Sequence, residues 1–194
     1  MLKDRFFYPV AALIALGMVF FALSFAQQVD LSDELIWTEG YLMEGEDLAR
    51  LTEQPGTQAV FNAAVADEPA FARLTSTTAR ANLPPGPGIF APLGPDYERA
   101  FSGRQLRMTI TARPSRINPL DEFDMAYFSA GAGDSGWKRR VLEPGWVDYT
   151  MEFKPGLRTA DPDLDYFSIW PGETAEARSM DVMRMRVEVL DAPN

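Results

Sequence analysis

Residues 106–113 read LRMTITAR, in which apolar and polar side chains alternate at every position. The same period of two recurs in WVDYTMEF at residues 146–153 and in MDVMRMRVEV at residues 180–189. In the last run, every second residue from Met183 onward is apolar. Successive side chains of a β-strand point to opposite faces, so each run predicts an antiparallel strand with one face in a core and one in water.

Shorter strand-like runs surround these three. EFDMAYFSA, GWKRRVL and DYFSIWPG begin at Glu122, Gly136 and Asp165, and segments rich in Gly and Pro separate them. Such segments are typical of turns. Many short antiparallel strands joined by turns predict a mainly β chain, folded as an antiparallel β-sandwich of the jelly-roll type.

The part of the chain before Pro95 is less regular. We expect residues 27–57 to form an acidic, strand-forming stalk, because apolar residues 35–37 lie between acidic clusters. A short helix is expected early in residues 58–82 and should end before Pro69. The stretch FARLTSTTAR at residues 71–80 is then expected to form a strand. Residues 83–95 contain five Pro and three Gly in 13 positions, which predicts an extended loop or an edge segment.

The composition excludes several kinds of chemistry. The 194 residues include no Cys and no His, so a disulfide, a thiol nucleophile, a Cys/His zinc site and a Ser-His-Asp triad are all ruled out. The formal net charge of −10 disfavours binding to nucleic acid or to anionic lipid headgroups. Neither Gly-rich phosphate-loop fingerprint is present.

Residues 6–26 form an uncharged apolar run of 21 residues, long enough to cross a bilayer as a helix. Lys3 and Arg5 precede the run and a strongly acidic segment follows it, which predicts a cytoplasmic N-terminus. A cleaved signal peptide is the alternative, because small residues Ser24 and Ala26 resemble a cleavage site. We therefore expect a cytoplasmic N-terminus, a transmembrane anchor, a juxtamembrane stalk and a periplasmic sandwich, at residues 1–5, 6–26, 27–57 and 58–194 of a bacterial inner-membrane protein.

Residues 95–190 resemble the jelly-roll carbohydrate-binding modules and the galactose-binding-like superfamily. The resemblance is carried by RQLRMTITAR, by GWKRRVLEPGWVDYTMEFKPG, by YFSIWPG and by the closing strand MDVMRMRVEVL. It implies a non-catalytic binding domain, often with a saccharide ligand and sometimes with a structural calcium. Members of this superfamily also serve as structural or protein-contact domains, so the resemblance bears more directly on the fold than on the function.

Three tryptophans are the main candidates for ligand binding. Sugar C–H faces stack on aromatic rings, and Trp137, Trp146 and Trp170, with Tyr127 nearby, could supply such rings. Arg139 could hold an acidic glycan or a carboxylate of a partner. The alternatives are that the Trp residues close the rim of the core and that the arginine belongs to solvated cross-strand ion pairs.

Two functions remain open on the sequence. The first is a membrane-anchored, non-catalytic periplasmic module that recognises an envelope saccharide. The second is a single-span accessory subunit of a larger inner-membrane complex, whose Ala11 and Ala15 would permit close packing against partner helices. No cofactor is expected. The acidic loops at residues 118–124 and 161–165 do not match a calcium-binding pattern, so no metal site is expected either. No catalytic residue and no enzymatic activity are predicted.

Overall fold

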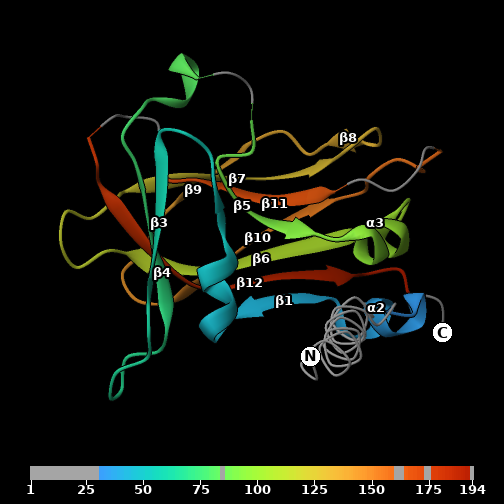
Figure 1. Ribbon diagram of the computed structural model, residues 1–194, viewed down its shortest axis with the longest axis horizontal. Coiled ribbons are helices and arrows are strands. Elements are labelled where there is room, and N and C mark those ends of the chain that lie inside the picture. Colours follow the sequence, from blue (N-terminus) through green and yellow to red (C-terminus); the bar gives the residue numbers. More distant parts are fainter. Residues whose placement is uncertain (1–30, 84–85, 160–163, 173–175, 193–194) are drawn as a thin grey trace, which may run out of the picture. The chain divides into compact units, whose positions relative to one another are not determined.

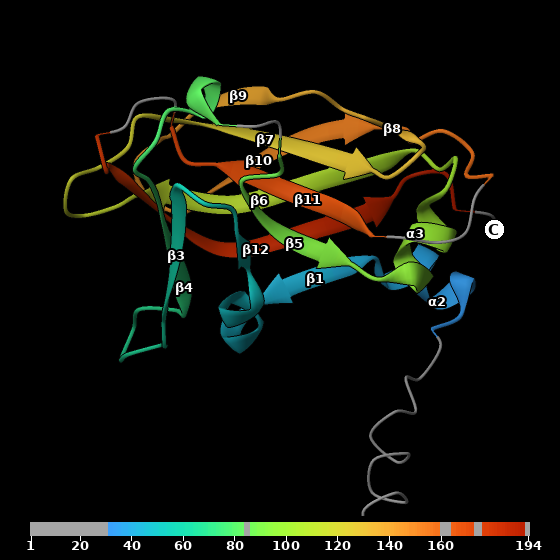
Figure 2. The ribbon, with the colours of Figure 1, turned by 45° about the horizontal axis from the view of Figure 1, so that its top comes forward.

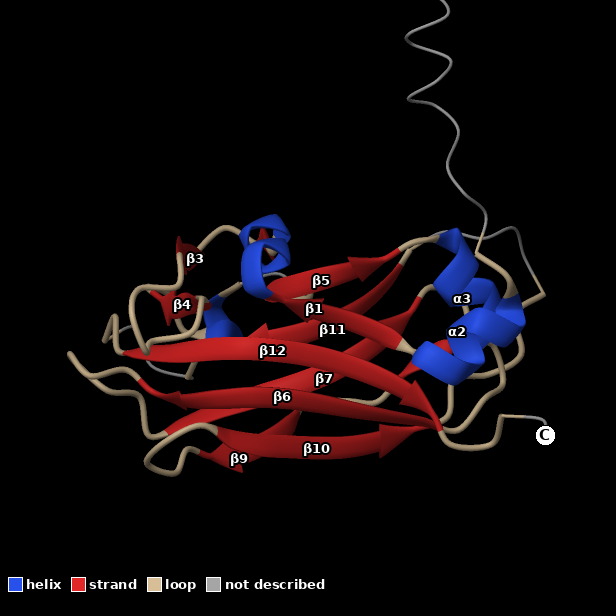
Figure 3. Cartoon of the chain, turned by 90° about the horizontal axis from the view of Figure 1, so that it is seen from below, coloured by secondary structure: helices blue, strands red, loops and turns tan. Residues whose placement is uncertain are grey.

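Two antiparallel sheets face each other in the computed structural model, which describes residues 31–83, 86–159, 164–172 and 176–192 (Figures 1 and 2). Sheet A has the strand order β10-β6-β12-β4-β3, and β1 also pairs with β12. Its strands are β1 (Tyr41–Glu44), β3 (Thr57–Asn62), β4 (Phe71–Ser76), β6 (Leu106–Pro114), β10 (Val147–Phe153) and β12 (Ser179–Val189). Figure 3 shows this sheet with β12 between β1 and β6.

Sheet B has the strand order β2-β5-β11-β7-β8, and β9 also pairs with β7. Its strands are β2 (Thr52–Glu53), β5 (Ile89–Leu93), β7 (Glu122–Ser129), β8 (Gly133–Asp134), β9 (Lys138–Val141) and β11 (Asp165–Trp170). The helices are short: α2 (Asp33–Glu39), α3 (Pro95–Phe101) and the 3-10 helices η1 (Gly45–Arg50) and η2 (Arg80–Asn82). The predicted mainly β, two-sheet sandwich is therefore confirmed.

The core lies between the sheets and is built from the apolar faces of the alternating strands. On β6, the apolar positions Leu106, Met108, Ile110 and Ala112 are all fully buried. The register places them beside apolar residues of β10 and β12 on the same face of sheet A. The strands predicted from a period of two therefore form, with the expected face inward.

The closing strand departs from strict alternation at one point. The pairing of β12 with β6 shifts between Val182 and Arg184, which leaves Met183 as an extra residue in a β-bulge. As a result, Val182 and Met180 are fully buried, whereas Met183 is only half-buried. The sequence prediction that Met183 shares the core face is therefore wrong, because a bulge exchanges the two faces of a strand.

The first apolar cluster after the N-terminal segment is helical and not extended. Ser32 caps α2 by accepting a hydrogen bond from the Leu35 amide, and acidic residues follow in the first turn. Gly40 ends the helix at a φ of 72°. The capping residues at the two ends of this segment, Ser32 and Gly40, thus favour a helix over the expected strand. The chain then enters sheets A and B through β1 and β2, so residues 41–53 belong to the sandwich.

Two further segments differ from expectation. The expected helix before Pro69 is absent, and residues 57–62 form β3, which pairs with β4 in a hairpin. The Pro-rich segment contributes β5, which pairs with β11 along its length but with β2 only at Ile89 and Phe90. Pro92 therefore lies where β5 is the sheet edge, and its missing amide proton costs no ladder hydrogen bond.

Among the described residues, no helix has the length and apolar character needed to cross a bilayer. The predicted span at residues 6–26 lies outside the described residues.

Candidate saccharide-binding face

The outer face of sheet B carries an unusual number of aromatic side chains. Strands β5, β11 and β7 lie side by side, and their alternation turns one set of residues inward. Ile89, Ile169 and Met125 form part of that inward set and are fully buried. The opposite set, which faces away from sheet A, includes aromatic residues on all three strands.

We call five of these residues the sheet B aromatic group: Phe90, Phe128, Trp137, Tyr166 and Trp170. Phe90 packs edge-on against Tyr166, with ring centroids 4.9 Å apart. Tyr166 lies directly across from Phe128 in the β11–β7 pairing. Phe128 contacts Trp137 at 5.4 Å, and Trp137 contacts Trp170 at 6.3 Å, both in edge-to-face geometry. Ring contacts therefore join Phe90 to Tyr166, and Phe128 to Trp137 and Trp170, and the β11–β7 pairing places these two sets side by side on the outer face of sheet B.

Small residues lie beneath these rings. Ala126 and Ser168 face each other across β7 and β11 on the outer side of the sheet, and both are fully buried. Ser168 Oγ and Trp170 Nε1 are buried atoms that make no hydrogen bond within the part of the chain that the structure describes. A buried polar group without a partner costs roughly 1–3 kcal/mol. Both groups could therefore pair favourably with a hydroxyl that enters between the rings.

A charged cluster borders the sheet B aromatic group at Trp137. Asp124 is buried, and its carboxylate pairs with Arg80 at 3.2 Å and with Arg139 at 3.1 Å. Arg139 also pairs with Glu122 at 3.1 Å. The guanidinium carbon of Arg80 lies 5.2 Å from the centre of the Trp137 ring, within cation–π range. The cluster thus holds Trp137 in place and supplies charged donors and acceptors beside it.

Three of the five residues predicted from sequence come together here. Trp137, Trp170 and Arg139 all belong to the outer side of sheet B, around Asp124. Tyr127 does not join them, because its position on β7 alternates with Phe128 and points into the core. Its hydroxyl lies 2.6 Å from Asp165 Oδ2, and burial raises the pKa of Tyr127 well above the usual value.

Trp146 lies on the other sheet. It precedes β10, and the guanidinium carbon of Arg113 is 4.2 Å from the centre of its ring. Phe71 approaches the same ring at 6.2 Å. The alternation in WVDYTMEF predicts that Trp146 points away from the core, and it does. Its ring is half-buried, and Arg113 covers one face of it. A sugar that stacks on Trp146 would have to use the other face.

Sequence reasoning missed Phe90, Phe128, Tyr166, Arg80 and Asp124 as members of this face. A signal for some of them was present, because the alternation in β7 puts Asp124, Ala126 and Phe128 on one side and Tyr127 on the other. No local pattern indicates Phe90 or Arg80, which reach the face only through the sheet order and the position of the 3-10 helix η2.

The described residues hold no group of three or more Asp or Glu side chains arranged to bind a metal ion. A row of aromatic rings next to carboxylates and guanidinium groups can bind a ring-shaped polyhydroxyl molecule, because the rings contact its C–H faces and the charged groups its hydroxyls. The outer face of sheet B is therefore suited to binding a molecule of this kind.

No protein-family model matches the chain, and no curated protein matches it. Similar folds occur among solved structures. The C-terminal family 22 carbohydrate-binding module of Clostridium thermocellum Xyn10B superposes with a TM-score of 0.54 at 14% identity, over 80% of this chain and 96% of that module. The second family 22 xylan-binding domain of Paenibacillus barcinonensis Xyn10C superposes with a TM-score of 0.50 at 6% identity, over 77% of this chain and 98% of that domain.

The chain thus has the jelly-roll fold of carbohydrate-binding modules, which confirms the resemblance noted in the sequence. At these sequence identities the likeness shows the fold alone. Any function must therefore be argued from the residues on the outer face of sheet B.

Proposed function

We propose that this protein is a non-catalytic saccharide-binding module whose ligand contacts the sheet B aromatic group. The observation that carries the proposal is the sheet B aromatic group, four of whose rings are half-buried, next to two buried polar atoms, Ser168 Oγ and Trp170 Nε1, that make no hydrogen bond among the described residues. The Trp170 ring itself is fully buried. Rings supply stacking area, and the unpaired groups supply a hydroxyl acceptor and an indole donor.

Xylan is the first saccharide to test, because the Paenibacillus domain with the same fold is described as xylan-binding. The charged cluster around Asp124 favours a ligand with hydroxyl groups at the Trp137 end. Bonds to ionised partners are stronger than bonds between neutral groups, so Arg80 and Arg139 would contribute to orientation as well as to affinity.

The proposal includes attachment to the bacterial inner membrane, with the sandwich in the periplasm. Its support is the uncharged run at residues 6–26 and the basic residues that precede it. An accessory subunit of a membrane complex is the alternative. Mild detergent extraction followed by a native gel distinguishes the two, because a subunit should migrate with stoichiometric membrane proteins and a binding module alone.

The saccharide site can be tested with two matched tryptophan substitutions. Trp137 and Trp146 are both half-buried, and each has a guanidinium group over its ring, but they lie on opposite sheets. We expect the full chain to be retarded in a native gel that contains soluble xylan. The loss of one stacking ring costs about 1.4 kcal/mol, so the dissociation constant for xylan obtained from this retardation should rise about tenfold in Trp137→Ala. Trp146→Ala should behave as the unsubstituted chain.

The opposite pattern, with binding lost in Trp146→Ala and kept in Trp137→Ala, would move the site to sheet A and refute the assignment. A glycan array extends the test beyond xylan. If the full chain binds no saccharide on the array and none in the gel, the proposed function is wrong.

A further inference from the structure

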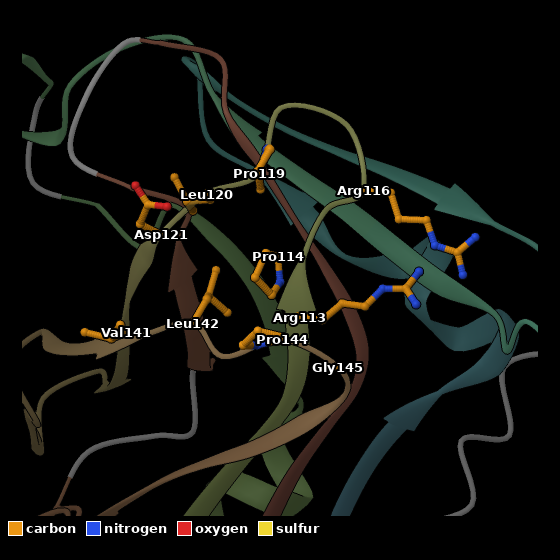
Figure 4. A pocket seen from close by; sticks show the side chains of 10 residues that line it. All are labelled: Arg113, Pro114, Arg116, Pro119, Leu120, Asp121, Val141, Leu142, Pro144 and Gly145. Carbon is orange, nitrogen blue, oxygen red and sulfur yellow. The ribbon is translucent and has the colours of Figure 1, made fainter.

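A pocket lies at one end of the sandwich, away from the residues of the sheet B aromatic group. It has a volume of about 620 Å³ and is formed where the loop that follows β6 meets the loop between β9 and β10 (Figure 4). Ligand pockets in proteins typically have volumes of about 300–1,000 Å³. The pocket is therefore large enough for a small organic molecule.

The walls of the pocket are mainly apolar. Leu120 and Leu142 are buried at its base, and prolines form much of the remaining surface: Pro114, Pro119 and Pro144. Figure 4 shows these side chains gathered around the hollow. Val141 borders the pocket and is 68% exposed, so its side chain adds accessible apolar surface at the rim.

Backbone hydrogen bonds hold both loops in place. The Leu120 amide donates to Ser179 O at 2.8 Å, and the Ser179 amide donates to Asn118 O at 2.9 Å. On the other loop, the Glu143 amide donates to the Tyr149 hydroxyl at 2.7 Å. The pocket is thus largely formed before any ligand binds, which limits the entropy lost on binding.

Arginine side chains lie on one side of the pocket. Arg113 and Arg116 both line it, and in Figure 4 their guanidinium groups reach out on the same side, opposite Asp121 and Val141. Asp121 is already paired with Arg178, at 2.6 Å. The two sides of the pocket therefore differ in charge.

The arginine side belongs to a network that contains more positive than negative groups. Asp181 pairs with Arg73 at 2.8 Å and with Arg113 at 3.2 Å. Glu68 contacts Arg113 and pairs with Arg116 at 2.6 Å. Among the described residues, three guanidinium groups in this network thus share two carboxylates, which is an excess of one positive charge in a protein whose net charge is −10.

Arg116 is the member of this network that solvent reaches most easily. Its side chain is 72% exposed, whereas that of Arg113 is 11% exposed and is held between Asp181, Glu68 and the Trp146 ring. An additional carboxylate would therefore meet Arg116 first. It would bring the network to three carboxylates for three guanidinium groups, and a guanidinium can bind a carboxylate with two parallel hydrogen bonds.

We propose that this pocket binds a small carboxylic acid with an apolar body. The body occupies the hollow between the prolines and leucines, and the carboxylate pairs with Arg116. A saccharide does not suit this place, because the walls offer few polar groups to its hydroxyls. The site is independent of the proposed saccharide site, and each can fail without the other.

A pair of matched compounds tests the proposal: 4-phenylbutyrate and 4-phenyl-1-butanol share the apolar body, and only the first has a carboxylate. Calorimetric titration of the full chain should show saturable binding of one 4-phenylbutyrate, with the alcohol at least tenfold weaker. Arg116→Gln should weaken the acid about tenfold and leave the alcohol unchanged. Arg107→Gln is the control, because Arg107 is also an exposed arginine in an ion pair, with Glu152, and neither residue lines the pocket.

The substituted arginine Arg116 is exposed, so the variant should fold, and unchanged circular dichroism would verify this. The proposal is refuted if the acid shows no saturable binding, if acid and alcohol bind equally, or if Arg116→Gln and Arg107→Gln have the same effect. Loss of binding in Val141→Arg, which places a bulky charged side chain at the pocket border, would support it further.

Discussion

Tyr127→Phe removes one hydrogen bond from the centre of the sandwich and leaves the shape of the core unchanged. The Tyr127 hydroxyl donates to Asp165 Oδ2 at 2.6 Å, and both residues are essentially inaccessible to solvent. Asp165 keeps Arg158, whose Nη2 lies 2.8 Å from Oδ1. A hydrogen bond to an ionised group contributes about 1.5–3 kcal/mol, so we expect about 2 kcal/mol of destabilisation at neutral pH.

The penalty should depend on pH through Asp165. Burial is the largest influence on this carboxyl and raises its pKa, and the bond from Tyr127 lowers it in part. A raised pKa in the folded chain contributes stability that is fully present below the unfolded value and is lost as pH rises through the folded value. Removing the donor raises this pKa further. The Tyr127→Phe deficit should therefore be small when Asp165 is protonated and should grow as pH rises.

Thermal unfolding followed by circular dichroism at pH 4 and at pH 7.5 measures this difference. In a chain of this size, about 2 kcal/mol corresponds to a fall in Tm of about 4–8 °C at neutral pH. Tyr149→Phe is the control, because its hydroxyl accepts a bond from the Glu143 amide and touches no buried carboxylate. An equal fall in Tm at both pH values would refute this account of Asp165.

Four further substitutions test the backbone conformation and the ion pairs. Gly40→Ala should destabilise the chain by more than about 2 kcal/mol in urea titrations, because a Cβ at a φ of 72° would lie 2.2 Å from Val187 O. Gly45→Ala, at a φ of 59° but with no atom within 4 Å, should cost about 1 kcal/mol or less, and equal losses would contradict the steric argument. Asp181→Asn should cost about 3 kcal/mol, because it removes the buried carboxylate that Arg73 and Arg113 share and leaves Arg113 with Glu68 alone. Arg107→Gln breaks an exposed pair with a cross-strand glutamate and should change stability by less than about 1 kcal/mol, a difference that 1 M salt removes.

Much of the fold could be predicted because period-two alternation and burial have the same physical cause. Strands β6 and β10 follow their predicted faces, because they pair with each other in unbroken register and every second residue of β6 from Leu106 to Ala112 is buried. The bulge at Met183 could not be predicted, because it arises where β12 changes partners on one side from β1 to β4. Helix α2 is a different case, because Ser32 and Gly40 are local capping signals that the apolar cluster concealed.

The candidate site was predicted only in part, for a geometric reason. Trp137, Trp170 and Arg139 are close to one another because β7 contacts both β9 and β11, a sheet order that no local pattern encodes. Residues that approach from distant parts of the chain, such as Arg80 and Phe90, depend on the same order. Alternation alone would have separated Tyr127 from Phe128, so this part of the site could have been found.

Strand β12 is the last strand of the chain and yet lies in the middle of sheet A. It pairs with β6 along nearly its whole length, and on its other side with β1 and β4 in succession. The two strands on one side of β12 and the three on the other cannot be joined until residues 179–189 have emerged, because β12 is the only connection between β6 and both β1 and β4 within the described sheet. Sheet A can therefore assemble only after β12 has been synthesised, and a protein truncated before Ser179 would leave two separate strand pairs, β10–β6 and β4–β3, and one unpaired strand, β1.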